Sequence, residues 1–315
     1  MFMWLPSAEA SVRRWHARPV AQHHQHWSAP GTCGEFLQGR LDGVDFLINS
    51  PIDCYSTAVV RRTSGSQIGV VDAALRSKVV AAMVELGERL SLPGGFEVQV
   101  TSDLPQGKGM ASSTADLVAA IGAMLAHAGV EWSTANIARL LVAIEPSDCT
   151  HVPGVGYVGH LCGTVFGNYS APTDLRVLIV DCGGVVDTVG FDRGLAHAVY
   201  ARNEPLLRSA LSMALRGLTL GDVATLARAA TISARLSQQI LPKAQFDNLL
   251  ALSSEHGGLG VNCAHSGSVL GLLYRPAGDL GPRLRRAVEH AFGPDLAIIG
   301  DHQFVSGGIH VQQRH

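Results

Sequence analysis

The sequence predicts an α+β fold composed of two successive units. Segments with helical periodicity alternate with β-rich segments over most of the 315 residues. After about residue 190 the texture changes to long helical segments rich in Ala, Leu and Arg, and further strands follow. This alternation indicates a second α+β unit behind the first. We therefore divide the chain into a peripheral segment (1–27), a first domain (28–190) and a second domain (191–315).

The first unit is predicted to begin with strands and turns over residues 28–62, where Thr57–Val60 is the most β-rich part. Ala73–Leu90 has apolar residues at helical spacing, which predicts an amphipathic helix. Phe96–Thr101 alternates apolar and polar residues as a half-buried strand does. A later helix begins after Ser133, a favoured N-cap residue, and ends before Pro146, since residues that precede proline avoid helical geometry.

The first unit ends with Leu175–Asp181, whose β-branched and apolar residues predict a buried strand. The second unit contains helical segments at about 195–239 and 243–256. A strand, a helix and a last strand complete the chain, and they are Val269–Tyr274, Leu280–Phe292 and a segment near Ala297.

The composition excludes several classes of function. Lys plus Arg (24) nearly balances Asp plus Glu (26), which argues against a nucleic-acid-binding surface. No stretch approaches the ~20 uninterrupted apolar residues of a membrane helix, and no apolar signal-peptide core is present. We expect a cytoplasmic protein without nucleic-acid or membrane partners. Its oligomeric state is open at this point, and a homodimer is compatible with the sequence.

Two further features are interpreted as structural. The six cysteines contain no C-x-x-C pair, so we expect reduced thiols rather than a zinc or redox motif. Residues 1–27 carry several histidines, but no carboxylate or cysteine stands at a fixed spacing to them. A loose segment is therefore the better interpretation than a metal site.

The most informative segment lies between the strand at Phe96–Thr101 and an apolar helix. It is Pro105-Gln-Gly-Lys-Gly-Met-Ala-Ser-Ser-Thr-Ala-Asp116. Gly107 and Gly109 let the backbone turn tightly and approach a ligand closely. The helix that follows points its free N–H groups and its positive dipole end toward the loop. Together with the mobile charge of Lys108, this predicts an anion site, and a polyphosphate is the ligand that we expect.

The same segment also has a plainer interpretation as an ordinary capped helix. Ser112 or Ser113 is expected to cap it, and Ser113-Thr114-Ala115-Asp116 has the capping-box spacing with Asp in place of Glu. The segment lacks the Walker pattern Gly-x-x-x-x-Gly-Lys-Ser/Thr and the dinucleotide fingerprint.

Two carboxylates flank the proline after the Ser133 helix, in Ile144-Glu-Pro-Ser-Asp148. Kinases hold Mg²⁺ with one or two carboxylate or hydroxyl oxygens and with nucleotide phosphates. A second carboxylate can orient the attacking hydroxyl or accept its proton. From spacing alone, a solvated helix end at Glu145 and a cap at Asp148 is slightly the better interpretation.

The loop resembles the phosphate loop of the GHMP kinases, Pro-x-x-x-Gly-Leu-x-Ser-Ser-x-Ala, with Met110 in the position of Leu. Five further segments occur in the same order as in one branch of that family, the L-threonine kinases of cobalamin biosynthesis. They are Ala29-Pro-Gly-Thr-Cys-Gly-Glu-Phe-Leu-Gln-Gly39, Ser50-Pro-Ile-Asp-Cys-Tyr-Ser-Thr57, Ile144-Glu-Pro-Ser-Asp148, Leu241-Pro-Lys243 and Ala264-His-Ser-Gly-Ser268. The resemblance covers about residues 29–275. The stretch His151–His160 shows none of the branch's motifs, and its glycines suggest a loop near the cleft.

This resemblance implies a two-domain GHMP kinase fold. The first domain would be similar to domain 2 of ribosomal protein S5, the second would be ferredoxin-like, and the site would lie in the cleft between them. ATP would be bound by Pro105, Gly107, Lys108, Gly109, Met110, Ala111, Ser112, Ser113 and Thr114. Glu145 would ligate Mg²⁺ together with Ser112 or Ser113. Asp148 would be the base, and Lys108 would screen charge during catalysis.

The remaining motifs are expected to bind the acceptor. Their candidate residues are Cys33, Glu35, Gln38, Asp53, His265, Ser266, Gly267 and Ser268. Glu35 suits an ammonium group, and Gln38 suits a carboxylate or hydroxyl. The alternatives are structural: an ion pair at Glu35 or Asp53, a packing role for Cys33 and a tight-loop role for His265.

The resemblance thus predicts ATP- and Mg²⁺-dependent phosphorylation of the L-threonine hydroxyl, giving O-phospho-L-threonine for cobalamin side-chain synthesis. Three alternatives remain open from the sequence. They are a sibling kinase for serine, homoserine or a pathway intermediate, a non-catalytic nucleotide or metabolite sensor, and an RNA-binding module. The intact Ser112, Ser113, Glu145 and Asp148 argue against the sensor, and the slightly acidic balance argues against RNA binding.

Overall fold

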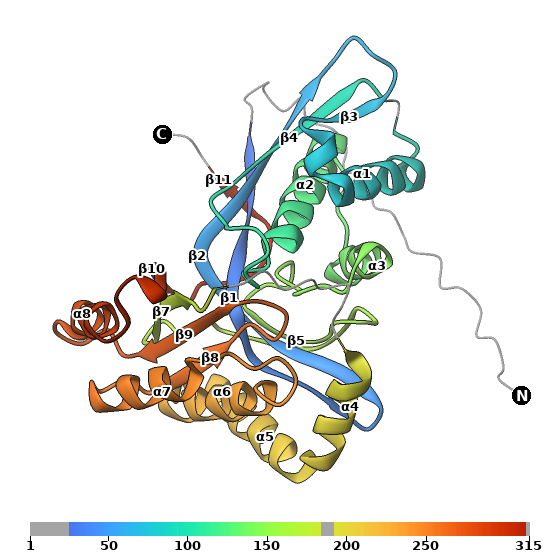
Figure 1. Cartoon of the computed structure of the whole chain (residues 1–315). Helices are drawn as coiled ribbons and strands as arrows, with labels where there is room; N and C mark the ends of the chain where they lie inside the picture. The colour runs from blue at the N-terminus through green and yellow to red at the C-terminus, as the bar shows by residue number, and fades with distance from the viewer. Residues whose placement is uncertain (1–24, 93, 184–191, 313–315) are drawn as a thin grey trace, which may run out of the picture.

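A long antiparallel hairpin forms the axis of the molecule (Figure 1). Its strands are β1 (His26–Leu41) and β2 (Val44–Arg62), joined by Asp42 and Gly43. Both turn residues have positive φ, 50° and 78°, as a two-residue type I′ turn requires, and Asp-Gly adopts this turn readily. The pairing of β1 with β2 contains three register irregularities between Pro30 and Leu37, and such bulges bend a strand.

The computed structural model describes residues 25–92, 94–183 and 192–312. The other strands extend the sheet on both sides of the hairpin in the order β10-β7-β9-β8-β1-β2-β4-β3, while β11 pairs with β1, β5 pairs with β2, and β6 pairs with β5. These strands are β3 (Ile68–Val70), β4 (Phe96–Ser102), β5 (Val155–Gly159), β6 (Thr164–Tyr169), β7 (Arg176–Asp181), β8 (Gly260–Cys263), β9 (Val269–Tyr274), β10 (Ala297–Gln303) and β11 (His310–Gln312).

Two groups of helices cover the sheet. In the first group, α2 packs on β1, β2 and β4, and α1 and α3 pack on α2. In the second group, α5 and α6 pack on β1, α6 and α7 pack on β8, and α8 packs on β7. The helices are α1 (Ser77–Leu90), α2 (Ser112–Ala128), α3 (Thr134–Ile144), α4 (Arg193–Arg202), α5 (Glu204–Leu220), α6 (Val223–Ser237), α7 (Phe246–Glu255) and α8 (Leu280–Phe292). A single apolar cluster joins both groups, because it contains Phe36, Ala115 and Leu207.

Most of the predicted elements of regular periodicity are confirmed, although the helix predicted over Ala73–Leu90 begins only at Ser77, after a 3₁₀ turn at Ala73–Leu75. The strand at Phe96–Thr101, the helix after Ser133 and the helix Leu280–Phe292 occur with bounds within two residues of the prediction. The long helical segment 195–239 is instead divided into α4, α5 and α6. Pro205 lies in the first turn of α5, and Gly221 ends that helix with φ 68° before Asp222 accepts a capping hydrogen bond from the Thr225 N–H.

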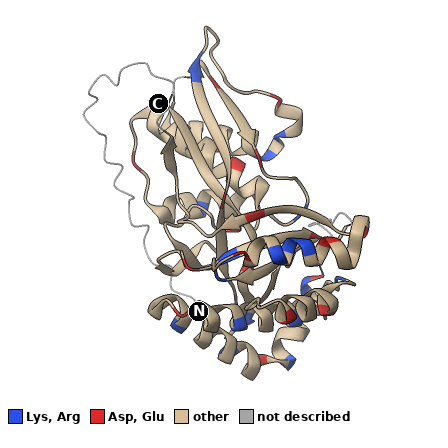
Figure 2. Cartoon of the chain, turned by 90° about the vertical axis from the view of Figure 1, so that its left-hand side faces the viewer, with Lys and Arg blue, Asp and Glu red and all other residues tan. Residues whose placement is uncertain are grey.

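The predicted domain boundary near 190 falls within 184–191, and most of the histidine-rich segment falls within 1–24, so both lie outside the described residues. On the N-terminal side of this gap, β7 pairs with β9 and β10, which come later in the chain. None of the helices in the described ranges has the length and apolar character needed to span a membrane. Basic and acidic residues are interspersed in both halves of the molecule, in keeping with the charge balance (Figure 2).

Candidate active site

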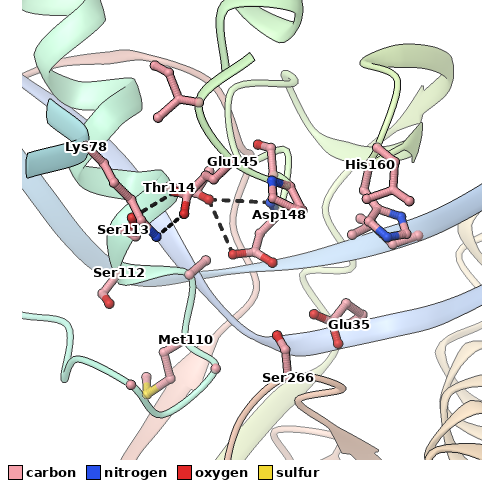
Figure 3. Close-up of a pocket in the computed structure, with 18 of the residues that line it drawn as sticks. Glu35, Lys78, Met110, Ser112, Ser113, Thr114, Glu145, Asp148, His160 and Ser266 are labelled. Atoms are coloured by element: carbon pink, nitrogen blue, oxygen red, sulfur yellow. Dashed lines mark hydrogen bonds and ion pairs between the residues drawn. The ribbon is translucent and has the colours of Figure 1, made fainter. Parts of the chain in front are cut away.

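A cavity of about 890 Å³ lies where the first turn of α2 faces the start of α1, the end of α3, the middle of β1 and the α4 helix. It combines an apolar floor with several convergent charged side chains, which is typical of a small-molecule site. Its charged and polar lining includes Glu35, Gln38, Asp45, Arg76, Lys78, Ser112, Ser113, Thr114, Asp116, Glu145, Asp148, His160, Arg193, His197 and Ser266. Figure 3 shows Glu145 and Asp148 beside the hydroxyls of α2, with Glu35 and His160 farther along the cavity.

The loop before α2 is held in place through its backbone. Gly107, Gly109 and Ala111 all have left-handed φ values, between 57° and 79°. The carbonyl of Met110 accepts a hydrogen bond from the Thr32 N–H at 3.0 Å, and the carbonyl of Gly109 accepts one from Gly34 at 3.3 Å. These bonds fix the loop on β1 through its backbone, and the buried Met110 side chain adds an apolar contact.

The predicted cap of α2 is wrong. Ala111 occupies the N-cap position, and no described side chain caps the helix. Ser113 instead donates to Glu145 at 2.8 Å, and Asp116 accepts from Ser56 and pairs with Arg76. The serines therefore leave the first N–H groups of α2 to a ligand, as an anion site requires.

Glu145 is the C-cap residue of α3, and its two carboxylate oxygens have different partners. Oε1 accepts the bond from Ser113, and Oε2 pairs with the ammonium of Lys78. A carboxylate and a hydroxyl oxygen this close together are suitable donors for Mg²⁺. The described residues contain no group of three or more His, Cys, Asp and Glu that could hold a metal by themselves. The donor set therefore fits a Mg²⁺ ion that completes its coordination with phosphates and water.

Asp148 follows Glu145 by three residues and is partly buried between α2 and β2. Thr114 donates its hydroxyl to the Asp148 carboxylate at 3.4 Å, and Asn49 holds the following backbone through the Cys149 carbonyl at 3.0 Å. Burial, together with the negative charges of Glu35 and Glu145, raises the pKa of Asp148 to about 7. A carboxyl group with this pKa can both accept and release a proton near neutral pH.

Glu35 forms the opposite wall of the cavity and is buried against His265. The Nδ1 atom of His265 lies 2.7 Å from Glu35 Oε2, and the His265 backbone N–H donates to the same oxygen at 3.1 Å. Burial lowers the pKa of His265, but Cys263 and Glu35 outweigh this and raise it to about 10. This contact is the ion pair that the structural alternative for Glu35 predicted.

Comparisons with known proteins agree with this arrangement. Residues 77–158, from the start of α1 to the end of β5, match the model of the GHMP kinases N terminal domain. The L-threonine kinase of Citrobacter freundii is 33% identical over 244 residues, which cover 78% of this chain and 84% of that protein. The chain belongs to the GHMP kinase family.

Solved structures agree on the fold of this GHMP kinase. The homoserine kinase from Cytophaga hutchinsonii superimposes with a TM-score of 0.72 at 16% identity, over 94% of this chain and 100% of that one. A structure described as MDDEF in complex with MVAPP, AMPPCP and magnesium gives a TM-score of 0.68 at 15% identity, over 92% and 99%. The predicted two-domain GHMP fold is confirmed, and the protein is a phosphotransferase that acts on a hydroxyl group with ATP as co-substrate.

Not all residues predicted for the kinase site line the cavity. Lys108 pairs with Asp181 at 2.7 Å, and Ser268 donates to the same carboxylate at 2.6 Å. Asp53 pairs with His302 at 2.8 Å, away from the cavity. Cys33 of β1 is fully buried, and Pro105, His265 and Gly267 also lie outside the lining set. The lining residues among the predicted ones are Glu35, Gln38, Gly107, Gly109, Met110, Ala111, Ser112, Ser113, Thr114, Glu145, Asp148 and Ser266.

The kinase site also contains residues that the sequence patterns did not indicate. Lys78 and Arg76 lie at the start of α1, and Arg193 and His197 belong to α4. His160 follows β5, where the sequence suggested a loop but Val155–Gly159 pairs with β2 instead. Burial lowers the pKa of His160 to about 4, so its imidazole is neutral. Only the glycine-rich stretch itself pointed to this part of the cleft.

Proposed function

We propose that the protein is an ATP:L-threonine O-phosphotransferase that produces O-phospho-L-threonine and ADP. The observation that carries this proposal is the placement of Glu145 and Asp148 beside the uncapped N-terminus of α2, in one cavity with Glu35. The 33% identity to an L-threonine kinase over most of both chains supports threonine as the acceptor. A role in cobalamin side-chain synthesis is proposed on the same similarity.

In this proposal the phosphates of ATP lie against the loop 105–111 and the first turn of α2. The backbone N–H groups there meet the negative charge at the positive end of the helix dipole. Glu145 and Ser113 would hold Mg²⁺, as the AMPPCP and magnesium complex of a structural relative suggests. When bound, Mg²⁺ neutralises phosphate charge.

Asp148 is proposed to orient the acceptor hydroxyl and to take its proton as the oxygen attacks the γ-phosphorus. The phosphorus–oxygen bond to ADP breaks, and the new bond forms to the threonine oxygen. Little covalent chemistry falls to the protein, so positioning and charge neutralisation supply most of the rate. The Thr114 hydroxyl and the backbone held by Asn49 keep the Asp148 carboxylate in place during this step.

Glu35 is proposed to receive the ammonium group of the amino acid. Only its Oε2 is tied to His265 by the contacts described, and Glu35 itself lines the cavity. Gln38 lines the same wall and suits the carboxylate. An acceptor that meets both Asp148 and Glu35 carries a hydroxyl and an ammonium group, as a small hydroxy amino acid does.

The test is ADP release from purified protein with MgATP and L-threonine, L-serine, L-homoserine or no acceptor, with product masses determined. Threonine-dependent ADP and a product heavier by one phosphate are expected. Turnover with homoserine alone would keep the kinase and replace the acceptor, an outcome that the fold of the homoserine kinase relative makes worth including. ATP binding without turnover on any acceptor would favour a sensor.

A further inference from the structure

Lysine is scarce in this chain, and its positions are unusual. The sequence has 24 basic residues, yet only Lys78, Lys108 and Lys243 are lysines. Lys78 pairs with Glu145, Lys108 pairs with Asp181, and buried Lys243 donates to the Ala264 carbonyl at 2.9 Å. Each ammonium thus contacts an oxygen in or beside the phosphate-binding region. Arginine supplies the other positive charges of the chain. Lysine differs from it in presenting a compact charge on a flexible stem, so we asked what this difference provides at Lys78.

Lys78 is placed against the preference of its own helix. It is the second residue of α1, where the positive end of the helix dipole disfavours a cation. Its partner lies across the cavity mouth at the end of α3, as the dashed lines in Figure 3 show. The Lys78 side chain is 47% exposed and the Glu145 side chain 13% exposed, so the ammonium can move away while the carboxylate stays.

The contact matters because of which oxygen it occupies. Glu145 Oε1 accepts from Ser113, and Oε2 is covered by Lys78, so the ammonium occupies part of the metal-binding group assigned above. A divalent cation and an ammonium repel each other and do not share one carboxylate oxygen. Bound Mg²⁺ and Lys78 therefore compete for the charge of the same carboxylate, and each weakens the binding of the other.

We propose that Lys78 is a displaceable counter-ion of Glu145, which leaves the carboxylate when metal and nucleotide bind and then pairs with the nucleotide phosphates. This inference rests on the proposed metal role of Glu145. In the free protein the ammonium holds the carboxylate beside Ser113. In the complex the same charge moves by the reach of one side chain to the phosphates beside α2. Metal and nucleotide consequently bind cooperatively, because the phosphates draw away the cation that competes with the metal.

The test measures metal binding directly and needs no turnover. Mn²⁺ is titrated into the protein and free Mn²⁺ is followed by electron paramagnetic resonance, first without nucleotide and then with saturating ADP. Without nucleotide, K78M is expected to bind Mn²⁺ about two- to fivefold more tightly than the wild type, the range that corresponds to the loss of one exposed ion pair. With ADP present, the advantage in Mn²⁺ affinity of K78M over the wild type is expected to shrink, because the phosphates draw Lys78 away from Glu145 in the wild type.

Three variants complete the design. R89M removes an exposed cation that pairs with Glu85 on the same helix and should bind Mn²⁺ as the wild type does. K78R keeps the charge and should not tighten Mn²⁺ binding in the absence of ADP. E145Q should abolish binding, and its failure to do so would reject the metal role of Glu145 itself. Equal or weaker Mn²⁺ binding by folded K78M without nucleotide, with E145Q inactive in binding, would overturn the counter-ion proposal alone.

Discussion

Asp148 shows how a single side chain obtains its chemistry from its surroundings. Burial and the charges of Glu35 and Glu145 raise its pKa, and Thr114 fixes its carboxylate. Replacing Asp148 with Asn keeps the shape and removes the proton acceptor. We expect a loss of turnover of at least ~100-fold, judged from typical acid–base contributions. Asp148 is proposed to act on the acceptor hydroxyl, so nucleotide affinity should change little. The Kd for ADP with Mg²⁺, measured by calorimetry, should stay within about threefold of wild type, which is less than 1 kcal/mol.

The raised pKa of Asp148 also predicts a pH dependence. Below pH 7 the carboxyl group is protonated and cannot accept the hydroxyl proton. The value of kcat/KM for the acceptor should therefore rise with pH up to about 7 and then level off. A profile that is flat between pH 5 and 8 would remove Asp148 as the base.

The same shift has a consequence for stability. Since the folded protein prefers the protonated form of Asp148, the free energy of unfolding falls as pH rises from about 4, where the unfolded chain ionises, to about 7, and it levels off above that. In metal-free protein, Asp148→Asn should therefore have the higher Tm at pH 8, by about 1.5 °C for each kcal/mol in a chain of 315 residues. The difference should shrink as the pH is lowered toward 4, which thermal unfolding at several pH values would reveal.

At this scale the sequence identified residue types better than partners. Spacing alone slightly favoured a helix end at Glu145 and a cap at Asp148, and only the resemblance of this short motif indicated a site that the cavity lining now includes. The partner of Glu35 could not be predicted, because His265 lies 230 positions away and the pair forms only when β1 meets the loop after β8. Ser113 was misassigned as a cap, since nothing in its neighbourhood in sequence shows that a carboxylate from α3 reaches it.

At the scale of elements, two loops are packed backbone against backbone. Gly267 lies on Gly109, and the Lys108 carbonyl accepts from the Ser268 N–H at 3.1 Å. A Cβ at position 267 would lie 2.3 Å from the Lys108 carbonyl oxygen, and this backbone atom cannot yield without moving the phosphate loop. Gly267→Ala should weaken ADP binding by about tenfold or more, a typical cost of a displaced site.

Gly65→Ala is the matched control for this substitution, because an added methyl group there meets its nearest heavy atom at 3.7 Å, on Thr63. It should bind ADP as the wild type does. Equal ADP affinity of both variants would show that the contact between the two loops does not position the nucleotide.

Asp116 fastens α2 to its neighbours in the first group of helices. It is 7% exposed, accepts from Ser56 of β2 and pairs with Arg76 before α1. Asp116→Ala leaves both partners without their acceptor, so we expect a loss of about 2–3 kcal/mol in the free energy of unfolding. Glu85→Ala, which breaks an exposed pair on α1, should cost less than about 0.5 kcal/mol. Urea unfolding of both variants gives the comparison.

Periodicity explains why some elements were predictable. The apolar positions of α1, α3 and α8 repeat at helical spacing, and that signal survives in a single sequence. The irregular path of β1 does not repeat, because its register shifts between Pro30 and Leu37 follow from partners on β2 and β8. The division of 195–239 into three helices was marked by Pro205 and Gly221, although the Ala- and Leu-rich composition around them concealed it.

At the scale of the whole molecule, the two predicted domains share one sheet and one apolar cluster. Phe36 of β1, Ala115 of α2 and Leu207 of α5 belong to the same buried group. We therefore expect a single cooperative thermal transition, with equal calorimetric and van't Hoff enthalpies. Two separated transitions by calorimetry would show that the two halves unfold independently of each other.

Glu35 stands where the two halves of the sheet meet. It forms the register pair with Cys263 that joins β1 to β8, and its carboxylate holds His265. Substitution of Glu35 would disturb these contacts, so we do not expect this residue to change when the acceptor changes. Evolution toward a different small alcohol should proceed through cavity residues without such contacts, of which neutral His160 is the clearest. We therefore expect a change of acceptor specificity that leaves the fold intact to begin with substitutions at position 160.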